Sequence, residues 1–398
     1  MQNQPAFKKE FVALMASLMS IVALSIDALL PALPDIGSAL QVSDPAENQK
    51  LITMIFLGLG FGQLIFGPLS DSFGRKPMVY IGFFIFIIAS YICVTTKSFE
   101  VMVMGRILQG VGLSSPRTIS LAMIRDSYSG DFMAKVVSIV VMFFILVPIV
   151  APTVGQTLLH LLNWQAIFNF NVFIGLGIII WFWRRQPETL PKSKRIAFSP
   201  SIFITGAKEF IRYKDAISFT LASGFITGSF MVYLSTSQQI FQEQYQLGEL
   251  FPYIFASTAI AVGFSTFTNS RFVMRFGAYN MAYYATIAYF AISLLYVLVF
   301  HTGQNPSLVV LMLFFLTQFF AVGFLFGNYR SLAMQPLGHI AGIGAAINGF
   351  VSTVMAVPIA NYIGSFVTDS VLPLFVGFSV FGALALLVFV FLKRTQRA

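Results

Sequence analysis

The chain has 398 residues, of which 57% are apolar and only 10% are charged. A soluble domain carries about 25% charged residues, so this composition cannot cover a protein surface that faces water and excludes a soluble globular protein. The formal net charge of +9 does not indicate a nucleic-acid partner, because the basic residues are dispersed between apolar stretches. The single cysteine, Cys93, cannot form an intramolecular disulfide and says nothing about the cellular compartment.

Nearly charge-free stretches that are long enough to cross a membrane fill most of the sequence, since about 20 helical residues span a hydrocarbon core of about 30 Å. No small-residue cleavage site follows the first stretch, so we expect an uncleaved first helix. The twelve predicted spans are 11–34, 51–70, 77–96, 101–124, 136–159, 166–183, 216–242, 250–270, 276–300, 302–329, 340–363 and 370–392. The expected fold class is therefore an all-α integral membrane protein embedded in a lipid bilayer.

The basic residues are distributed unevenly between the two sides of these spans. Twenty of the 24 Lys and Arg lie on the side of the two chain ends, eight of them within or beside the connection 185–214. Only Lys50 and Lys97 lie in connections on the other side, and Arg106 and Arg117 lie within a span. The positive-inside rule then predicts that both termini and the connection 185–214 are cytoplasmic.

Asp27 is the only carboxylate deep within any predicted span. A charge at that depth costs at least about 2.5–3.5 kcal/mol on insertion scales, so such a residue normally faces the interior of the bundle and is functional. Burial favours the uncharged form of a carboxylic acid, which would allow Asp27 to carry a proton. Binding of a cationic substrate is a second role for Asp27, and a fixed structural partnership with an arginine is the alternative.

A dense polar run, Gly-Pro-Leu-Ser-Asp-Ser-Phe-Gly-Arg-Lys at residues 67–76, separates the second and third spans. Its two glycines permit close backbone approach and unusual dihedral angles, so we expect a sharp turn between two helices. The run resembles the G-x-x-x-D-x-x-G-R-K loop between helices 2 and 3 of the major facilitator superfamily (MFS). That resemblance implies twelve transmembrane helices in two parallel-repeat six-helix bundles.

The same resemblance implies a conformational latch that holds the two bundles together on the cytoplasmic side in the outward-open state. Asp71 is expected to cap a helix N-terminus or to pair with a basic side chain such as Arg125. Anchoring of the topology alone could explain Arg75 and Lys76. The expected latch residues are Gly67, Asp71, Gly74, Arg75, Lys76 and Arg125.

The fourth span contains Gly-Arg-Ile-Leu-Gln-Gly at residues 105–110, which resembles the R-x-x-Q-G motif of proton-coupled MFS members. At 1.5 Å per residue, Arg106 and Asp27 both lie about 10 Å below the outer membrane face, and we expect them to pair. Such a pair would couple proton exchange to conformation, because a nearby cation favours the charged carboxylate; the alternative is a static brace between two helices. Gln109 would either orient Arg106 or contact substrate.

Pro148, Pro152 and Gly155 in the fifth span resemble the G-P-x-x-G antiporter motif of drug exporters, although the first glycine is absent. Packing between membrane helices also explains Pro and Gly at such positions. Residues 25–34, Ser-Ile-Asp-Ala-Leu-Leu-Pro-Ala-Leu-Pro, resemble the first-helix signature of the Bcr/CflA branch of drug:proton antiporters. Both resemblances imply export.

The polar connection 185–214 divides the chain into an N-terminal bundle, 1–184, and a C-terminal bundle, 215–398. The tetrapeptide Ser-Leu-Ala-Met at 120–123 recurs at 331–334, as expected for parallel repeats with a substrate cavity at their interface. In the seventh span, aromatic, thioether and amide side chains would contact substrate on a cavity helix of the family, with packing between helices as the alternative. These candidate contacts are Met231, Tyr233, Gln238 and Gln239.

The predicted function is proton-coupled export of amphipathic drugs or similar small molecules across a bacterial inner membrane by alternating access. We expect the transporter to act as a monomer without cofactors. A siderophore or metabolite transporter of the same fold is one alternative, and a membrane-embedded lipid enzyme or scramblase is another. The three histidines lack metal-ligand spacing, and the sequence contains no Walker A loop, zinc motif or hydrolase elbow. We therefore expect no metal site, no nucleic-acid partner and no enzymatic activity.

Overall fold

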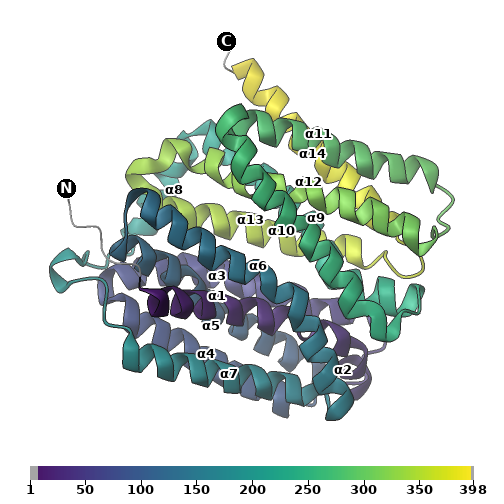
Figure 1. Cartoon of the computed structure of the whole chain (residues 1–398), viewed down its shortest axis with the longest axis horizontal. Coiled ribbons are helices and arrows are strands. Elements are labelled where there is room, and N and C mark those ends of the chain that lie inside the picture. Colours follow the sequence, from purple (N-terminus) through teal and green to yellow (C-terminus); the bar gives the residue numbers. More distant parts are fainter. Residues whose placement is uncertain (1–7, 396–398) are drawn as a thin grey trace.

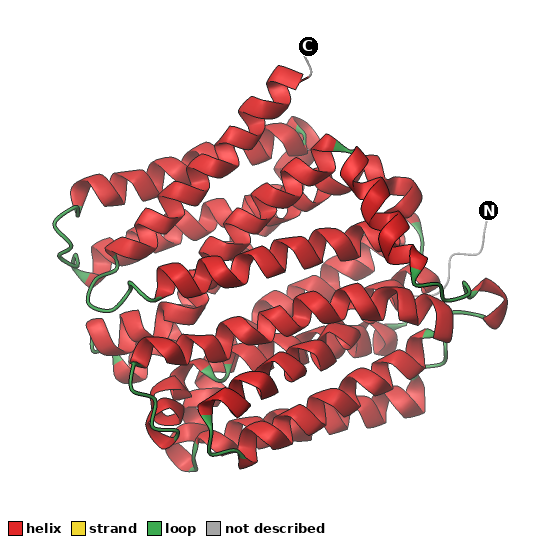
Figure 2. Cartoon of the chain, turned by 180° about the vertical axis from the view of Figure 1, so that it is seen from behind, coloured by secondary structure: helices red, strands yellow, loops and turns green. Residues whose placement is uncertain are grey.

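The computed structural model describes residues 8–395, without the side chains of residues 131, 134 and 393–395. Within that part the fold is helical and contains no strand (Figure 2). The first six long helices are α1 (Lys9–Asp27), α3 (Lys50–Phe73), α4 (Arg75–Thr95), α5 (Phe99–Ser127), α6 (Gly130–Leu161) and α7 (Trp164–Arg185). The other six are α9 (Lys214–Gln238), α10 (Phe251–Phe276), α11 (Ala278–Val299), α12 (Leu308–Met334), α13 (Ala341–Gly364) and α14 (Leu372–Thr395).

Shorter helices connect these elements. They are η1 (Leu30–Ala32), α2 (Leu33–Ala39), η2 (Pro45–Gln49), η3 (Lys192–Lys194), α8 (Ser201–Arg212), the π-helical η4 (Gln239–Gln244), η5 (Gly248–Leu250) and η6 (Gln335–Ile340). Each of the twelve long helices overlaps one predicted span, and the ends differ by a few residues. Hydrophobic length therefore placed the helices correctly.

The helices form two groups, α1–α7 below and α9–α14 above in the view of Figure 1. Contacts between the groups run mainly along α3 against α13 and α6 against α10. The second long helix of each group thus meets the fifth long helix of the other, as expected for two repeats that face each other. We refer to the groups as the two halves; the exact boundaries at residues 184 and 215 stay a prediction.

Helix α5 differs from its neighbours because it lies inside the first half, against α3 and α4. Ten stretches of the described chain are long and apolar enough to cross a membrane, and one of them, Leu308–Gly364, contains both α12 and α13. Helix α5 is not in that set. Its buried face carries glycine, serine and glutamine together with Arg106. These residues lower the mean hydropathy of α5, which suits a helix that packs among other helices.

Two local details differ from the expectations. The first span is not one helix through residue 34, because α1 ends at Asp27. Pro31 explains the break, since a proline ring clashes with the carbonyl four residues earlier and offers no N–H. The polar run 67–76 is almost entirely helical, and only Gly74, with φ 105°, separates α3 from α4.

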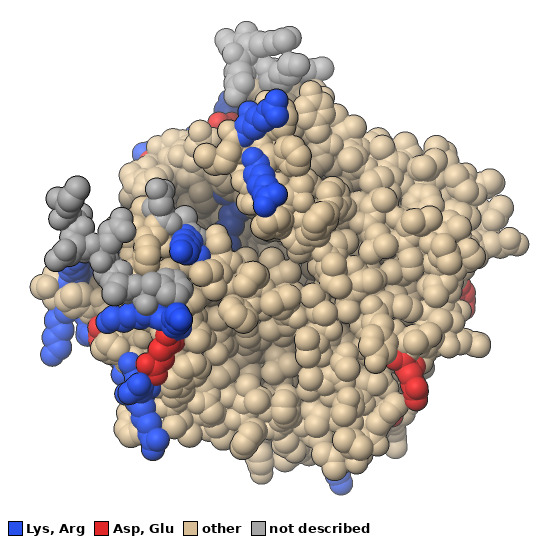
Figure 3. All heavy atoms as spheres, in the orientation of Figure 1, with Lys and Arg blue, Asp and Glu red and all other residues tan. Residues whose placement is uncertain are grey.

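Most lysines and arginines gather at the end of the molecule that holds the start of α1, the turn between α3 and α4 and the connection 185–214, on the left of Figure 3. We call this the basic end. At the opposite end the halves are joined by hydrogen bonds: Gln49 Nε2 donates to Gln239 Oε1 (2.8 Å), and Thr53 Oγ1 donates to Asn361 Oδ1 (2.6 Å). The structure is therefore closed at the end away from the basic charge.

Candidate functional site: a buried carboxylate and its surroundings

Asp27 lies at the last position of α1, where the helix breaks, and only 4% of the residue is exposed. Among the residues that the structure describes, none forms a hydrogen bond or an ion pair with its carboxylate. A buried carboxylate without a donor or a cation is far more stable as the neutral acid than as the anion. The surroundings of Asp27 therefore suit a protonated side chain in this conformation.

Arg106 is almost fully buried, with 1% exposed, and braces three helices. Its Nε donates to the Leu51 carbonyl (2.7 Å), and its Nη1 donates to the Ser25 carbonyl (3.2 Å) and to Gln109 Oε1 (2.8 Å). Gln109 is oriented in turn, because its Nε2 donates to Ser90 Oγ (2.7 Å). Gln109 thus orients the arginine, which is one of the two roles expected for it.

The expected ion pair between Asp27 and Arg106 is not formed in the part of the chain that is described. The two residues do lie close in the fold, since Arg106 reaches the carbonyl of Ser25, two residues before Asp27. The last four carbonyls of a helix lack intrahelical partners. The break at Asp27 therefore frees the Ser25 carbonyl, to which Arg106 donates instead of to the carboxylate. Nη2 of Arg106 is buried and has no partner among the described residues, so one donor is left for an additional acceptor.

Gly155 of the antiporter-like segment packs directly against this break. A Cβ atom at position 155 would lie 1.9 Å from the carbonyl oxygen of Ala28, so only glycine permits the contact. Pro148 and Pro152 lie within α6, which continues through both of them. The segment therefore has a definite local role: it lets α6 approach the residue that follows Asp27.

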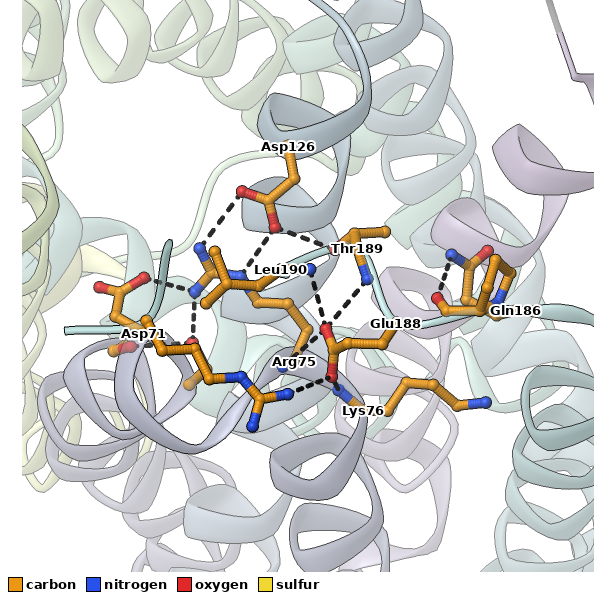
Figure 4. A network of polar contacts seen from close by, with 12 residues as sticks. Asp71, Arg75, Lys76, Asp126, Gln186, Glu188, Thr189 and Leu190 are labelled. Atoms are coloured by element: carbon orange, nitrogen blue, oxygen red, sulfur yellow. Dashed lines mark hydrogen bonds and ion pairs between the residues drawn. The ribbon is translucent and has the colours of Figure 1, made fainter. Parts of the chain in front are cut away.

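The turn between α3 and α4 is held by a polar network around Arg75 (Figure 4). Arg75 Nη1 donates to Asp71 and to Ser70 Oγ (2.8 Å), while its Nε donates to Asp126 Oδ2 (2.9 Å). Asp71 accordingly pairs with the arginine of its own motif. The expected pairing of Asp71 with Arg125 was wrong, because Asp126, the next residue on α5, points into the network instead.

Glu188, in the connection after α7, completes this network and was not singled out from the sequence. Its Oε1 accepts from the backbone N–H of Arg75 (3.1 Å), and its Oε2 accepts from the backbone N–H of Lys76 (3.1 Å). A carboxylate at these first two N–H groups caps α4 and interacts favourably with the helix dipole. An acidic residue within an otherwise basic connection was the available signal.

The hydrogen-bond and ion-pair partners of the 67–76 motif come from α3, α4, α5, α7 and the connection 186–196. Among the described residues, none of the hydrogen bonds or ion pairs of Asp71, Arg75 or Lys76 reaches the second half. The network in this conformation ties the connection to the first half. It does not latch the two halves together here, and Gly67 faces open space.

The residues expected on the seventh span are all buried in the second half or at the closed end. Tyr233 donates or accepts a hydrogen bond with Thr258 (2.7 Å) and packs on the ring of Phe319. Gln239 joins the halves through Gln49, while Gln238 donates to Glu243 (3.1 Å). Met231 is also buried. No group of three or more potential metal ligands occurs among the described residues.

Comparisons with known proteins agree with this geometry. Residues 15–360 match the family model described as Major Facilitator Superfamily. The chain is 28% identical over 370 residues to an uncharacterized MFS-type transporter, YdgK, of Bacillus subtilis, covering 92% of this chain and 91% of the relative. It is 29% identical over 280 residues to a bicyclomycin resistance protein homolog of Haemophilus influenzae, covering 70% of each chain.

Among solved structures, a peptide transporter POT in complex with sulfate superposes with a TM-score of 0.76 at 13% identity, covering 99% of this chain and 96% of that structure. At this identity the likeness concerns the fold alone. The family match and the relatives, together with two halves of six long helices, lead to one conclusion. The chain is a multi-pass membrane protein that belongs to the major facilitator superfamily of transporters.

Proposed function

We propose that this transporter exports amphipathic small molecules across a bacterial inner membrane in exchange for protons. The observation that carries the proposal is Asp27, a carboxylate buried at a helix break without a cation or donor among the described residues. Proteins rarely keep such a group inside a membrane unless it functions. The resemblance to a bicyclomycin resistance protein homolog supports drugs as substrates.

In the proposed cycle Asp27 is protonated in the conformation described here and releases its proton in another. Arg106 is placed to favour that release, since its unpartnered Nη2 lies in the same region as the α1 break. A change at the break that brings the carboxylate to this donor would stabilise the anion. Arg106 would then act as a positioning and gating residue, while Gln109 keeps its guanidinium oriented.

Alternating access would arise from rocking of the two halves about the α3–α13 and α6–α10 contacts. The closure through Gln49 and Thr53 would open, and the basic end would close. With the basic end in the cytoplasm, as the positive-inside rule favours, this conformation faces inward. Four residues of α9 and η4 remain proposed substrate contacts of the second half: Met231, Tyr233, Gln238 and Gln239. We also propose that a single chain suffices for transport.

Proteoliposomes that contain the purified full chain test this function. A pH gradient should drive uptake of an amphipathic dye into vesicles that are acidic inside, and addition of the dye should cause a matching proton movement. Dye uptake that does not depend on the pH gradient and is accompanied by no proton movement would overturn the proposal that the transporter exchanges its substrate for protons. Absence of any transport of dyes and drugs would overturn drug export.

A further inference from the structure

Three arginines gather near the basic end, two from the first half and one from the second. Arg117 and Arg125 lie two turns apart on α5 in the first half, and Arg330 lies near the end of α12 in the second half. Arg330 is within electrostatic range of both Arg117 and Arg125. Positive charges from opposite halves are thus brought together across the interface.

These guanidinium groups have no acidic partner among the described residues. The neighbouring carboxylates are engaged elsewhere: Asp71 and Asp126 bind Arg75, and Glu209 binds Arg212. The Arg117 guanidinium lies over the ring of Phe144, whose centroid is 6.0 Å away. Because like charges repel and none is neutralised here, the group is poised to accept an anion.

The arginines are also accessible. Arg125 and Arg330 are exposed, and Arg117 is partly exposed. One turn before Arg330, a side chain at Gly327 would meet open space. Figure 3 shows the surface hollowed between the halves toward the basic end. A ligand that enters from this end therefore meets Arg117 and Arg330 before it reaches the closed part of the interface.

We propose that Arg117 and Arg330 bind the oxyanion of an amphipathic substrate, a carboxylate or a phosphate attached to an apolar aromatic body. The proposal rests on the proposed transport function and names a substrate class for it. The planar guanidinium fork binds carboxylate and phosphate oxygens through two parallel hydrogen bonds, and the ring of Phe144 offers an apolar surface beside Arg117. An anion between the two halves would also relieve the repulsion that opposes closure of the basic end.

The test uses two probes of the same shape, 2-naphthoate and 2-naphthamide, with the purified full chain in detergent. Binding is measured by the shift in thermal unfolding. The wild-type protein should bind the carboxylate more tightly than the amide, and Arg330→Gln or Arg117→Gln should weaken naphthoate binding roughly tenfold or more without changing naphthamide binding. The matched control is Arg271→Gln on α10, whose guanidinium lies over its helix neighbour Phe267; it should bind both probes like the wild type.

Equal binding of the two probes to the wild type, or unchanged naphthoate binding in both glutamine variants, would overturn the proposal. A short-chain phosphatidylglycerol supplies the second arm. If it binds in an Arg330-dependent way while naphthoate does not, the site belongs to a lipid headgroup and the substrate proposal fails. Export of a neutral dye by Arg330→Gln distinguishes failure of the oxyanion site from failure of the proposed transport function. If the variant still exports the dye in exchange for protons, the transport function holds whatever the naphthoate result.

Discussion

Replacement of Asp126 by asparagine tests the polar network at the turn between α3 and α4. Arg75 donates to Asp126 at 2.9 Å and 3.3 Å, and the two side chains are 8% and 16% exposed. Breaking a buried pair by removing one partner costs about 3–5 kcal/mol, but Arg75 keeps a second carboxylate, Asp71, which is more exposed. We therefore expect Asp126→Asn to lower the free energy of unfolding by about 1–2 kcal/mol, at the low end of the cost of a lost charged hydrogen bond.

Arg75→Gln should lower the free energy of unfolding by more, about 3–4 kcal/mol, because two carboxylates then lose their cation. The double variant Arg75→Gln, Asp126→Asn should lower it by less than the sum of the two single effects, and the difference is a coupling energy of about 1–2 kcal/mol. Cys93 makes the measurement direct: it is the single cysteine and is buried, so a thiol-reactive dye labels it only on unfolding. The assay is an SDS titration in mixed micelles, followed by that labelling.

The exposed pair Arg212–Glu209 provides the control, since the arginine side chain is 74% exposed. Arg212→Gln should change the free energy of unfolding by about 0.5 kcal/mol or less. Additive effects of Arg75→Gln and Asp126→Asn, or an Arg212→Gln effect as large as theirs, would show that the network does not stabilise the turn as its geometry indicates.

Three further outcomes are expected. Glu188→Ala should lower the free energy of unfolding by about 1–2 kcal/mol, as measured in the same titration, because α4 loses its cap; an unchanged midpoint would contradict the capping role. Gly155→Leu should reduce dye export strongly, because any Cβ collides with the Ala28 carbonyl; full activity of correctly inserted protein would refute the close approach. In the double variant Thr53→Cys, Asn361→Cys, oxidation should form a disulfide and stop transport, as judged by gel mobility and restoration with reductant. A cross-linked protein that still transports would mean that this end does not open.

The positions of the helices could be predicted from the sequence because hydrophobic length decides them. The break at Asp27 could also have been predicted, since Pro31 stands four residues after it, but the long apolar stretch concealed it. Depth along the membrane normal correctly brought Arg106 near the first helix. Depth does not determine how a helix is rotated about its axis. Arg106 donates to the Ser25 carbonyl at the break, to the Leu51 carbonyl and to its neighbour Gln109, and none of its donors reaches the Asp27 carboxylate.

The partners of the 67–76 motif were harder to predict. The difference between Arg125 and Asp126 as its neighbour on α5 is a rotation of about 100° around a helix, which no local pattern determines. Glu188 lies more than a hundred residues from the N–H groups that it caps, in a connection whose path depends on the whole fold. A contact between residues so far apart in the sequence can be predicted only where an unusual charge marks one of them.

In the proposed mechanism Asp27 carries the exchanged proton. Asp27→Asn is nearly isosteric and cannot titrate, so in proteoliposomes it should retain exchange of labelled for unlabelled dye across the membrane while losing uptake driven by a pH gradient. Asp35→Asn, at an exposed carboxylate on α2, is the control and should keep both activities. Gradient-driven uptake by Asp27→Asn at the wild-type rate, with its accompanying proton movement, would contradict the mechanism.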